Sequence, residues 1–249
     1  MQSEPVEKII KVLECLNNHH ADSISLHDLA RVTHIPKATL LRIVSSLMQH
    51  GYVTRDAQRK YLSNVSLSRI LPVSGSHLER LRVSLHSLLE RTRQAVEVLV
   101  VRDAALYWYE KIDHPELSIR LIARPGFKRK IYELDSPVRL YMKTIGRGRI
   151  EKLYDTSGFY MTGCDYRKVS WDTAWRIIDE ADVNNVAYDE QGNSNGVRRF
   201  AALVSLQPGE MSYLLSVAEP AIHRNNEHEH IEMISKILLE EKRKLESVQ

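Results

Sequence analysis

The chain has few cysteines, no long apolar run and a polar N-terminal segment. Its two cysteines, Cys15 and Cys164, stand far apart and in no spacing typical of a metal or redox site. Their scarcity excludes a disulfide framework and fits a reducing compartment. No apolar run approaches the length that spans a bilayer, and the first segment is too charged for the core of a secretory signal. These absences predict a soluble, cytoplasmic protein with no membrane partner.

The common catalytic and cofactor signatures are absent as well. The sequence has no G-x-S-x-G segment, and neither cysteine stands near a histidine in a recognisable nucleophile motif. Gly146 and Gly148 lack the third glycine and the preceding strand of a dinucleotide-binding loop, so a hinge between two helices explains them better. We therefore expect no catalytic residues and no cofactor.

Histidines and glutamates crowd a short segment near the C-terminus and raise the question of a metal. The segment contains His223, Glu227, His228, Glu229 and His230. On a helix, His228 and His230 face different directions, and a two-ligand site from the remaining pair is weak. We interpret the segment as the solvated start of a helix and expect no metal.

The N-terminal part of the chain carries a helix-turn-helix pattern. Ser25 can cap a helix over residues 26–32, and Pro36 sets the backbone for the start of a second helix over residues 36–49. Gly51 is a typical residue for ending that helix. An earlier amphipathic helix closes the small core with an apolar face of Val6, Ile9, Ile10, Leu13 and Leu16.

The second of these helices has two different faces. Its predicted core face consists of Leu40, Ile43, Val44 and Leu47. The opposite face is small, polar and cationic, with Ala38, Arg42, Ser45 and Gln49. Small side chains let a helix approach base edges, and Arg42 can reach guanine or a phosphate. Lys37 adds a phosphate contact near the helix start.

A short basic β-ribbon is predicted to follow, with strands over residues 52–55 and 60–62. An ordinary surface hairpin of helices is the alternative interpretation, but the added ribbon and its charge favour DNA binding. The predicted DNA-binding residues are Lys37, Ala38, Thr39, Arg42, Ser45, Gln49, Arg55, Arg59 and Lys60.

The net charge of the chain is concentrated in its first part. The whole chain carries a formal charge of +3. The first 75 residues contain nine lysines and arginines and six aspartates and glutamates, which accounts for the entire excess. A polyanionic partner is therefore expected to bind the N-terminal domain.

A second helical segment separates this domain from the rest of the chain. Residues 72–75 break the pattern, and Ser76 with Glu79 reads as a capping box. The helix carries a leucine seam at Leu78, Leu81, Leu85 and Leu88. The seam covers under two heptads, so a dimer contact and packing onto the chain's own core both remain open.

The remaining residues alternate between strand and helix patterns. Strands are predicted over residues 96–101, 106–111, 118–123, 186–189, 198–206 and 212–218, and helices over residues 136–154, from Ser170 onward and from about residue 225. Pro208 and Gly209 predict a type II turn between the last two strands. This order indicates an α+β domain, with an antiparallel sheet on which helices pack.

Together these segments resemble the IclR family of bacterial transcriptional regulators over essentially the whole chain. The closest match is the recognition-helix motif, from Ile35 through Thr39 to Arg42 and on to Val53, with Ala38 in place of the usual serine. The resemblance implies a two-domain fold: a winged helix-turn-helix over residues 1–72, a linker helix over 73–93 and a GAF-like α+β effector domain over 94–249. It also implies homodimers or tetramers that bind double-stranded operator DNA and sense small organic acids or aromatic catabolites.

The second half of the chain resembles the family less evenly. The resemblance implies that the effector site is lined by Asp189, Arg199, Ser216 and Ala218. Arg199 stands where the family frequently has cysteine, and Ala218 stands where a serine can donate a hydrogen bond. After Gly126, the Pro-Leu-His segment and the Ala-x-Gly-Lys turn of relatives are replaced by other residues.

Arg199 suggests two opposite interpretations. A guanidinium in a pocket beside Ser216 can bind a carboxylate in a planar, two-pronged contact, which predicts an organic-acid effector. Alternatively, Arg199 forms a structural ion pair with Asp189 or Glu190, and no ligand binds.

Three functions are consistent with this sequence. The first is a sequence-specific transcriptional regulator controlled by a small organic acid or aromatic catabolite. The second keeps the DNA binding but uses the C-terminal domain only for oligomerisation. The third, an enzyme with an appended winged helix, lacks a catalytic constellation.

Overall fold

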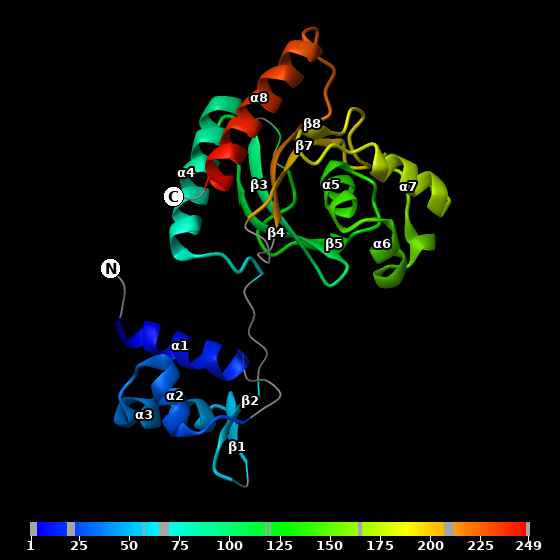
Figure 1. Cartoon of the computed structure of the whole chain (residues 1–249). Coiled ribbons are helices and arrows are strands. Elements are labelled where there is room, and N and C mark those ends of the chain that lie inside the picture. The colour runs from blue at the N-terminus through cyan, green and yellow to red at the C-terminus, as the bar shows by residue number, and fades with distance from the viewer. Residues whose placement is uncertain are drawn as a thin grey trace. The chain divides into compact units, whose positions relative to one another are not determined.

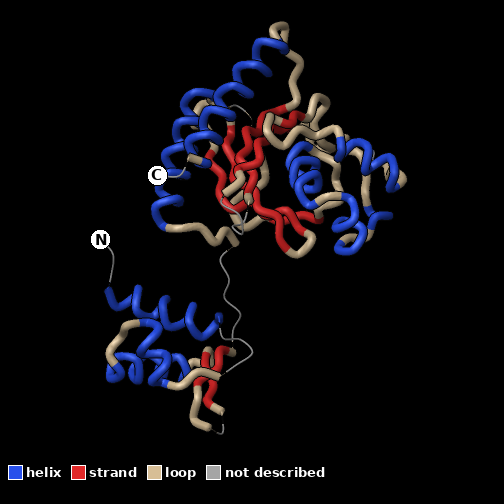
Figure 2. Tube along the Cα trace, in the orientation of Figure 1, coloured by secondary structure: helices blue, strands red, loops and turns tan. Residues whose placement is uncertain are grey.

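The computed structural model describes residues 4–18, 23–56, 58–64, 70–117, 119, 121–163, 166–206 and 212–247. The chain divides into two compact units, Met1–Arg69 and Ile70–Gln249. Figures 1 and 2 show the helices and strands of each unit. Among the helices of the described residues, none combines the length and apolar composition that a membrane-spanning segment needs.

The first unit is a three-helix core with a two-stranded ribbon. It contains α1 (Glu4–Asn18), α2 (Leu26–Thr33) and α3 (Lys37–Gln49), followed by β1 (Val53–Arg55) and β2 (Tyr61–Ser63), which pair antiparallel. Its core is built from Val12, Cys15, Leu16, Ile24, Leu29, Ile35, Leu40, Val44, Val53 and Tyr61. The predicted winged helix-turn-helix is confirmed.

Local signals fix the ends of α2 and α3. The Ser25 hydroxyl accepts a hydrogen bond from the Asp28 backbone N–H at 3.1 Å, which caps α2 as predicted. After α3, Gly51 has a φ of +77°, in the left-handed region. Its N–H donates to the Met48 carbonyl at 3.0 Å, and the Tyr52 N–H donates to the Leu47 carbonyl at 2.9 Å. This pair of bonds is the Schellman motif, which turns the chain from α3 into the ribbon.

Replacement of Gly51 by alanine is expected to destabilise the first unit by about 1–2 kcal/mol, because a side chain strains the left-handed conformation. Hydrogen exchange of the α3 amides in the full chain measures this loss. Gly75→Ala is the matched control, because Gly75 begins a helix without a positive φ and an added Cβ meets no atom within 4 Å. Equal protection of the α3 amides in both variants would show that Gly51 is not required for its conformation.

The predicted apolar face of α1 is only partly correct. Val12, Cys15 and Leu16 are buried, whereas Val6 and Ile10 are 53% and 48% exposed. Ile9 is also exposed. The small core covers only the C-terminal half of α1, so the apolar stripe continues beyond the residues that it can bury.

The second unit is built on a six-stranded antiparallel sheet with the strand order β5-β4-β3-β8-β7-β6. Its strands are β3 (Ala95–Arg102), β4 (Ala105–Ile112), β5 (Lys128–Lys130), β6 (Ala187–Tyr188), β7 (Val197–Val204) and β8 (Tyr213–Pro220). Its helices are α4 (Gly75–Thr92), α5 (Ser136–Ile145), α6 (Arg147–Leu153), the 3-10 turn η1 (Thr156–Gly158), α7 (Trp171–Asp179) and α8 (Glu227–Glu246). The predicted α+β architecture is confirmed.

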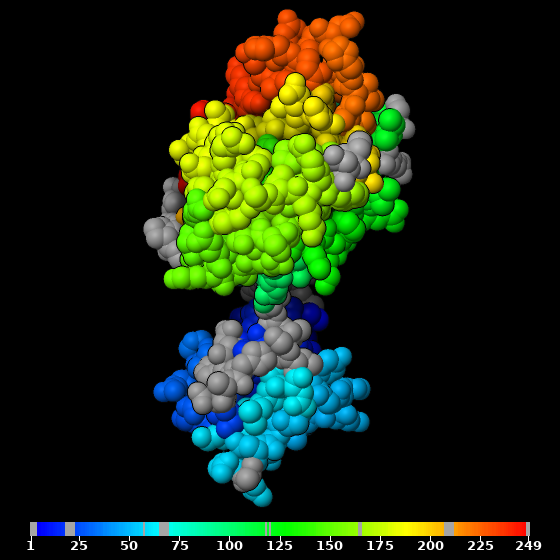
Figure 3. All heavy atoms as spheres, turned by 90° about the vertical axis from the view of Figure 1, so that its right-hand side faces the viewer, coloured from blue at the N-terminus to red at the C-terminus, as the bar shows by residue number. Residues whose placement is uncertain are grey.

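The two faces of the sheet are covered by different helices. Helices α4 and α8 pack on one face, and α5, α6 and α7 lie on the other (Figure 1). The latter helices form much of the green-to-yellow surface in Figure 3. Because side chains alternate along a strand, Val96 and Val98 point toward α4 and α8, whereas Glu97 and Leu99 belong to the opposite face.

The leucine seam of α4 packs inside the second unit. Leu81, Leu85 and Leu88 are buried in the core that α4 shares with α8 and β3. The helix begins two residues before the predicted position, because the Ser74 hydroxyl, rather than Ser76, accepts from the His77 backbone N–H at 3.1 Å. Of the two serines that can cap this helix, the one before Gly75 does so.

One predicted strand is wrong. Residues 119 and 121–123, which are the described part of the predicted strand 118–123, form no strand. The edge strand is instead β5, where Lys128 pairs with Tyr107 and Lys130 pairs with Ala105 of β4. Backbone pairing with β4 selects this basic segment, which has none of the apolar alternation that predicts a strand. The predicted turn at Pro208 and Gly209 lies outside the described residues.

Candidate functional site

The first candidate surface is the exposed face of α3. Lys37, Ala38, Arg42, Ser45 and Gln49 are all exposed. Thr39 is half-buried, and with Arg42 it borders a hollow of about 450 Å³ between α3 and α1. The opposite face of α3 holds the unit together through Leu40 and Val44, which are fully buried. The helix therefore presents the small, polar and cationic face that the sequence predicts.

Arg42 has no internal carboxylate to neutralise it. Within the described residues, no ion pair or hydrogen bond involves its side chain, whereas Arg31 on α2 donates to Asp28 at 3.0 Å. An exposed, unpaired guanidinium is free to contact a phosphate or a guanine edge.

The ribbon carries three more exposed cations, Arg55, Arg59 and Lys60. Arg55 Nε donates to the Arg59 carbonyl at 3.0 Å, and its guanidinium lies 5.2 Å from the centre of the Tyr61 ring. The Asp56 carboxylate accepts from the Lys60 backbone N–H at 2.8 Å. These contacts tie the base of the turn and leave the basic side chains on the surface of the ribbon.

The second candidate site is a cavity of about 510 Å³ on the α5 side of the sheet in the second unit. Aromatic and apolar residues from β4 and the following loop form one part of its wall, and residues 193–197 form another. Of the described residues, the charged side chains in the wall are Arg129, Glu133 and Arg199. Of the four predicted effector residues, Arg199 is in this wall, whereas Asp189, Ser216 and Ala218 are buried beside the cavity without lining it.

Arg199 reaches across the sheet to a buried glutamate. Arg199 Nε donates to Glu97 Oε2 at 2.9 Å, and Glu97 is fully buried. The two residues lie on β7 and β3, on either side of β8, where Ala218 pairs with Arg199 and Ser216 pairs with Glu97. The small side chains at these two positions of β8 leave room for the arginine to cross. The predicted partners Asp189 and Glu190 are therefore wrong, because the ion pair is made with Glu97.

The outer end of Arg199 lies against an aromatic ring and makes no hydrogen bond with the described residues. Within the described residues, neither Nη atom of Arg199 makes a hydrogen bond, although the side chain is only 6% exposed. The guanidinium carbon lies 5.3 Å from the centre of the Trp108 ring. Trp108 Nε1 is also buried without a hydrogen-bond partner. Buried donors without partners are uncommon in folded proteins and are frequently satisfied by a ligand or by water.

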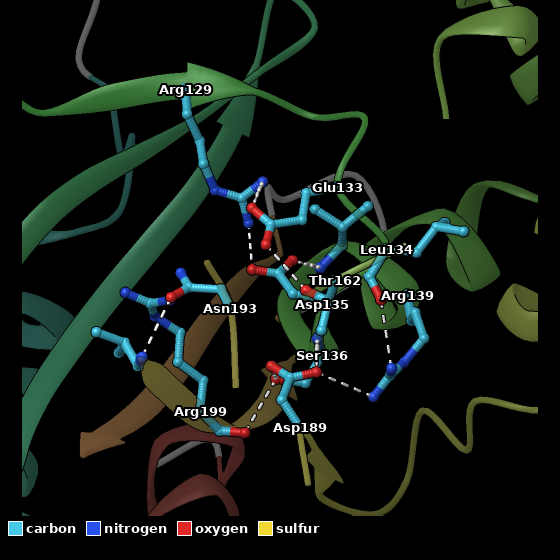
Figure 4. Close-up of polar contacts among 12 residues, drawn as sticks. Arg129, Glu133, Leu134, Asp135, Ser136, Arg139, Thr162, Asp189, Asn193 and Arg199 are labelled. Carbon is cyan, nitrogen blue, oxygen red and sulfur yellow. Dashed lines mark hydrogen bonds and ion pairs between the residues drawn. The ribbon is translucent and has the colours of Figure 1, made fainter. Parts of the chain in front are cut away.

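Asp189 fastens the start of α5 to the sheet. Its carboxylate accepts from the backbone N–H and the hydroxyl of Ser136, both at 2.8 Å, and pairs with Arg139 at 3.4 Å (Figure 4). Burial, together with the neighbouring Asp135, raises the pKa of Asp189 to about 6. The position of Asp189 therefore has a structural explanation, and its side chain does not face the cavity.

Three further charged groups beside the cavity were not predicted. Arg129 of β5 pairs with Asp135 through Nη2 and with Glu133 through Nη1 at 3.3 Å (Figure 4). The Thr162 hydroxyl donates to Glu133 at 2.9 Å. Burial and the nearby Asp135 carboxylate raise the pKa of Glu133. The sequence signal was the segment after Gly126, where the chain departs from the family pattern and carries several charged residues, among them these three.

The histidine-rich start of α8 is not a simple solvated segment. His230 Nε2 lies 2.7 Å from Glu219, and Glu227 lies 2.5 Å from Arg198. Both contacts join α8 to the sheet, so the prediction that these side chains are solvated is wrong for Glu227 and His230. Among the residues that the structure describes, no three histidines, cysteines or carboxylates are grouped closely enough to hold a metal.

Comparisons with known proteins found similarity in sequence and in fold. Residues 5–57 match the IclR helix-turn-helix domain. Over 129 residues the chain is 28% identical to the HTH-type transcriptional regulator KipR of Bacillus subtilis (strain 168), a match that spans 50% of this chain and 51% of that protein. The chain thus matches about half the length of this curated relative.

Solved structures extend the likeness in fold. An IclR transcriptional regulator from Alicyclobacillus acidocaldarius matches with a TM-score of 0.59 and 18% identity, over 99% of this chain and 98% of that one. An IclR homologue from Microbacterium hydrocarbonoxydans, solved in complex with 4-hydroxybenzoate, matches with a TM-score of 0.55 and 16% identity, over 97% and 99% of the two chains. The helix-turn-helix domain of this chain is thus similar in sequence to the IclR helix-turn-helix domain, and its two-unit fold is similar to those of IclR regulators along nearly the whole chain.

Proposed function

We propose that the protein is a sequence-specific DNA-binding regulator of transcription whose second unit binds a small effector. The DNA-binding part of this proposal rests on the exposed face of α3. This face has small side chains and the unpaired Arg42, and it lies opposite the buried side of the helix. A helix with such a face can enter the major groove, where base edges differ enough to be read. The partner is double-stranded operator DNA in the cytoplasm, bound by a dimer or tetramer of the chain.

The side chains of the first unit divide into two roles. Arg42, Ser45 and Gln49 stand on the groove-facing surface of α3, where they are placed to read bases. Lys37 and the ribbon residues Arg59 and Lys60 contribute phosphate contacts, which fix register without reading sequence.

The cavity of the second unit supports the effector half of the proposal. Its volume of about 510 Å³ is within the range of small-molecule sites, and its wall is mainly apolar with a few polar groups. The two unpartnered Nη atoms of Arg199 are suited to the two oxygens of a carboxylate. The ligand shifts the equilibrium between DNA-competent and incompetent forms only if it binds one of them more tightly.

An oligomerisation module without a ligand is the second candidate for this unit. The Arg199–Glu97 ion pair favours that view, because it gives the arginine a structural role by itself. Thermal shift of the full chain against a panel of organic and amino acids separates the two candidates. A ligand that raises the melting temperature and alters operator release supports the effector role, and no response to any compound supports the module.

The arginines of the first unit provide the test of DNA binding. Arg42→Ala is expected to weaken binding to a specific operator by about 1–3 kcal/mol while leaving nonspecific DNA nearly unaffected, if Arg42 reads a base. Arg59→Ala is expected to weaken all sequences similarly and to flatten the salt dependence. Gel-shift titrations on operator and scrambled fragments at several salt concentrations measure both effects.

Arg31→Ala is the control for these titrations, because Arg31 is an exposed cation of α2 that already pairs with Asp28. A uniform loss from Arg42→Ala on both kinds of DNA would assign it to a phosphate. Equal retention of operator and scrambled DNA by the wild-type protein would contradict sequence-specific binding altogether.

A further inference from the structure

Among the described residues, the charges around the cavity do not balance. Contacts join three arginines, Arg129, Arg139 and Arg199, to four carboxylates, Glu97, Glu133, Asp135 and Asp189. Arg199 is matched by Glu97, and Arg139 is matched by Asp189. Arg129 is shared by Glu133 and Asp135, so one carboxylate in this buried group has no cation of its own within the part of the chain that the structure describes (Figure 4).

The surplus carboxylate is Glu133. Asp135 makes the tighter contact with Arg129 and accepts the backbone N–H of Val138 at the start of α5, whereas the second oxygen of Glu133 accepts only from the Thr162 hydroxyl among the described residues. Glu133 lies at 3.3 Å from Arg129, is 7% exposed and lines the cavity. A buried carboxylate is costly to keep charged without a cation. The raised pKa of Glu133, caused by burial and by Asp135, has the direction that this imbalance requires.

The same cavity wall also contains a guanidinium whose outer donors have no hydrogen-bond partner among the described residues. Arg199 is anchored through Nε, and its two Nη atoms have no hydrogen-bond partner among the described residues. A carboxylate on a ligand would complete this guanidinium with two parallel N–H···O bonds. The cavity wall thus offers a site for an anion at Arg199 and a site for a cation at Glu133.

Apart from Arg129 and the polar residues 193–195, most of the remaining described wall is apolar or aromatic. It includes Trp108, Leu121, Phe127, Tyr160 and Tyr166. A simple acid of two or three carbons would leave most of a 510 Å³ cavity filled with water against these side chains. A ligand with an apolar side chain would cover them and gain free energy from the buried area.

We propose that the effector is a zwitterion, an amino acid with an apolar or aromatic side chain, whose carboxylate binds Arg199 and whose ammonium group binds Glu133. This assignment rests on the proposed effector role of the second unit and narrows its ligand class. It replaces the simple organic acid expected from Arg199 alone. Such an acid offers no cationic group to Glu133, which would repel the carboxylate of the acid or have to be protonated to accept it.

Matched series of small molecules test the proposal on the full-length wild-type chain. Isothermal titration calorimetry is run with L-phenylalanine, with 3-phenyllactate, which lacks the ammonium group, and with phenethylamine, which lacks the carboxylate. L-leucine, 2-hydroxyisocaproate and isoamylamine form a second series. At least one amino acid is expected to bind tenfold or more tightly than both of its truncated counterparts. Equal or tighter binding of the hydroxy acids, or no binding by any member, would overturn the proposal.

Two variants and a control locate the two ends of the ligand. Glu133→Gln is expected to weaken amino-acid binding at least tenfold and to leave 3-phenyllactate unchanged or bound more tightly. Arg199→Lys keeps a cation for Glu97 but loses the two-pronged contact, so it weakens both ligands. Glu229→Gln, at an exposed position on α8, is expected to change neither. Equal weakening of both ligands by Glu133→Gln would overturn the assignment of the ammonium site.

The outcomes separate this inference from the function on which it rests. Tight binding of a hydroxy acid that releases operator DNA would overturn the zwitterion and leave the ligand-controlled regulator intact. Operator binding that is indifferent to sequence would contradict the regulator, whichever ligand the cavity holds. The comparison of wild-type ligands needs no variant, so it remains decisive even if Glu133→Gln fails to fold.

Discussion

Replacement of Arg199 by methionine is expected to lower the free energy of unfolding of the second unit by about 3–5 kcal/mol. The stability is lost because Glu97 then has no ion-pair partner. Glu97 is fully buried, its Oε2 accepts only from Arg199 within the described residues, and its Oε1 is buried without a partner. Without the guanidinium, Glu97 must remain as an uncompensated charge or take up a proton. Urea denaturation followed by tryptophan fluorescence measures the loss.

A double variant distinguishes the destabilisation caused by leaving Glu97 unpaired from the net stabilisation that the ion pair provides. Glu97→Met combined with Arg199→Met removes both charges, and apolar side chains in their place are expected to recover most of the stability. Arg147→Met is the control, because its pairs with Glu151 and Asp172 are exposed and screened by solvent. A loss from Arg199→Met as small as that from Arg147→Met would mean that Glu97 is adequately solvated.

The partner of Arg199 illustrates what a single sequence does not determine. Glu97 lies 102 positions away along the chain, and the two residues meet only because β8 separates β7 from β3 in the sheet. One local signal was available, since Glu97 is an isolated acid within the apolar strand 95–101. Such a residue predicts a buried cationic partner, but strand order and register decide which cation that is.

The first unit was predictable because its signals are local. The Ser25 cap, Pro36 at the start of α3 and Gly51 after its end each act within a few residues. The structure places Ser25 and Gly51 as expected, and Pro36 immediately before the first helical residue instead of at it. The buried stripe of α3 follows from helical periodicity alone. The face of α1 was less predictable, because periodicity identifies an apolar stripe but not how far the core extends along it.

At the edge of the sheet, local sequence signals did not predict the strand correctly. Residues 118–123 have the composition of a strand, yet their described part forms none, whereas the basic segment Lys128–Lys130 pairs with β4. Strand propensity mainly reports how side chains fit their neighbours in a formed sheet. The position of β5 matters for the site, because it brings Arg129 beside Glu133 and Asp135.

Glu219 joins the start of α8 to the sheet through two arginines and a histidine. Its Oε1 accepts from Arg198 Nε at 2.6 Å, and its Oε2 lies 2.7 Å from His230 Nε2 and 3.3 Å from Arg224 Nη2. Both Glu219 and Arg198 are almost fully buried. Removal of the carboxylate therefore leaves Arg198 with Tyr188 and Glu227 as its side-chain partners, in a place with little access to water.

Glu219→Ala is accordingly expected to destabilise the second unit by about 3–5 kcal/mol, because it leaves a buried guanidinium partly uncompensated. The loss of amide protection should be largest in the first turns of α8, since Arg224 and His230 flank the helix start and both lose their carboxylate partner. Hydrogen exchange of the full chain measures this distribution. Glu232→Ala is the control, because Glu232 is exposed and, among the described residues, pairs only with the exposed His228 at 3.6 Å, so its loss should cost less than about 0.5 kcal/mol. Uniform loss of protection across α4 and α8 would instead mean that Glu219 supports the whole core and not the helix start.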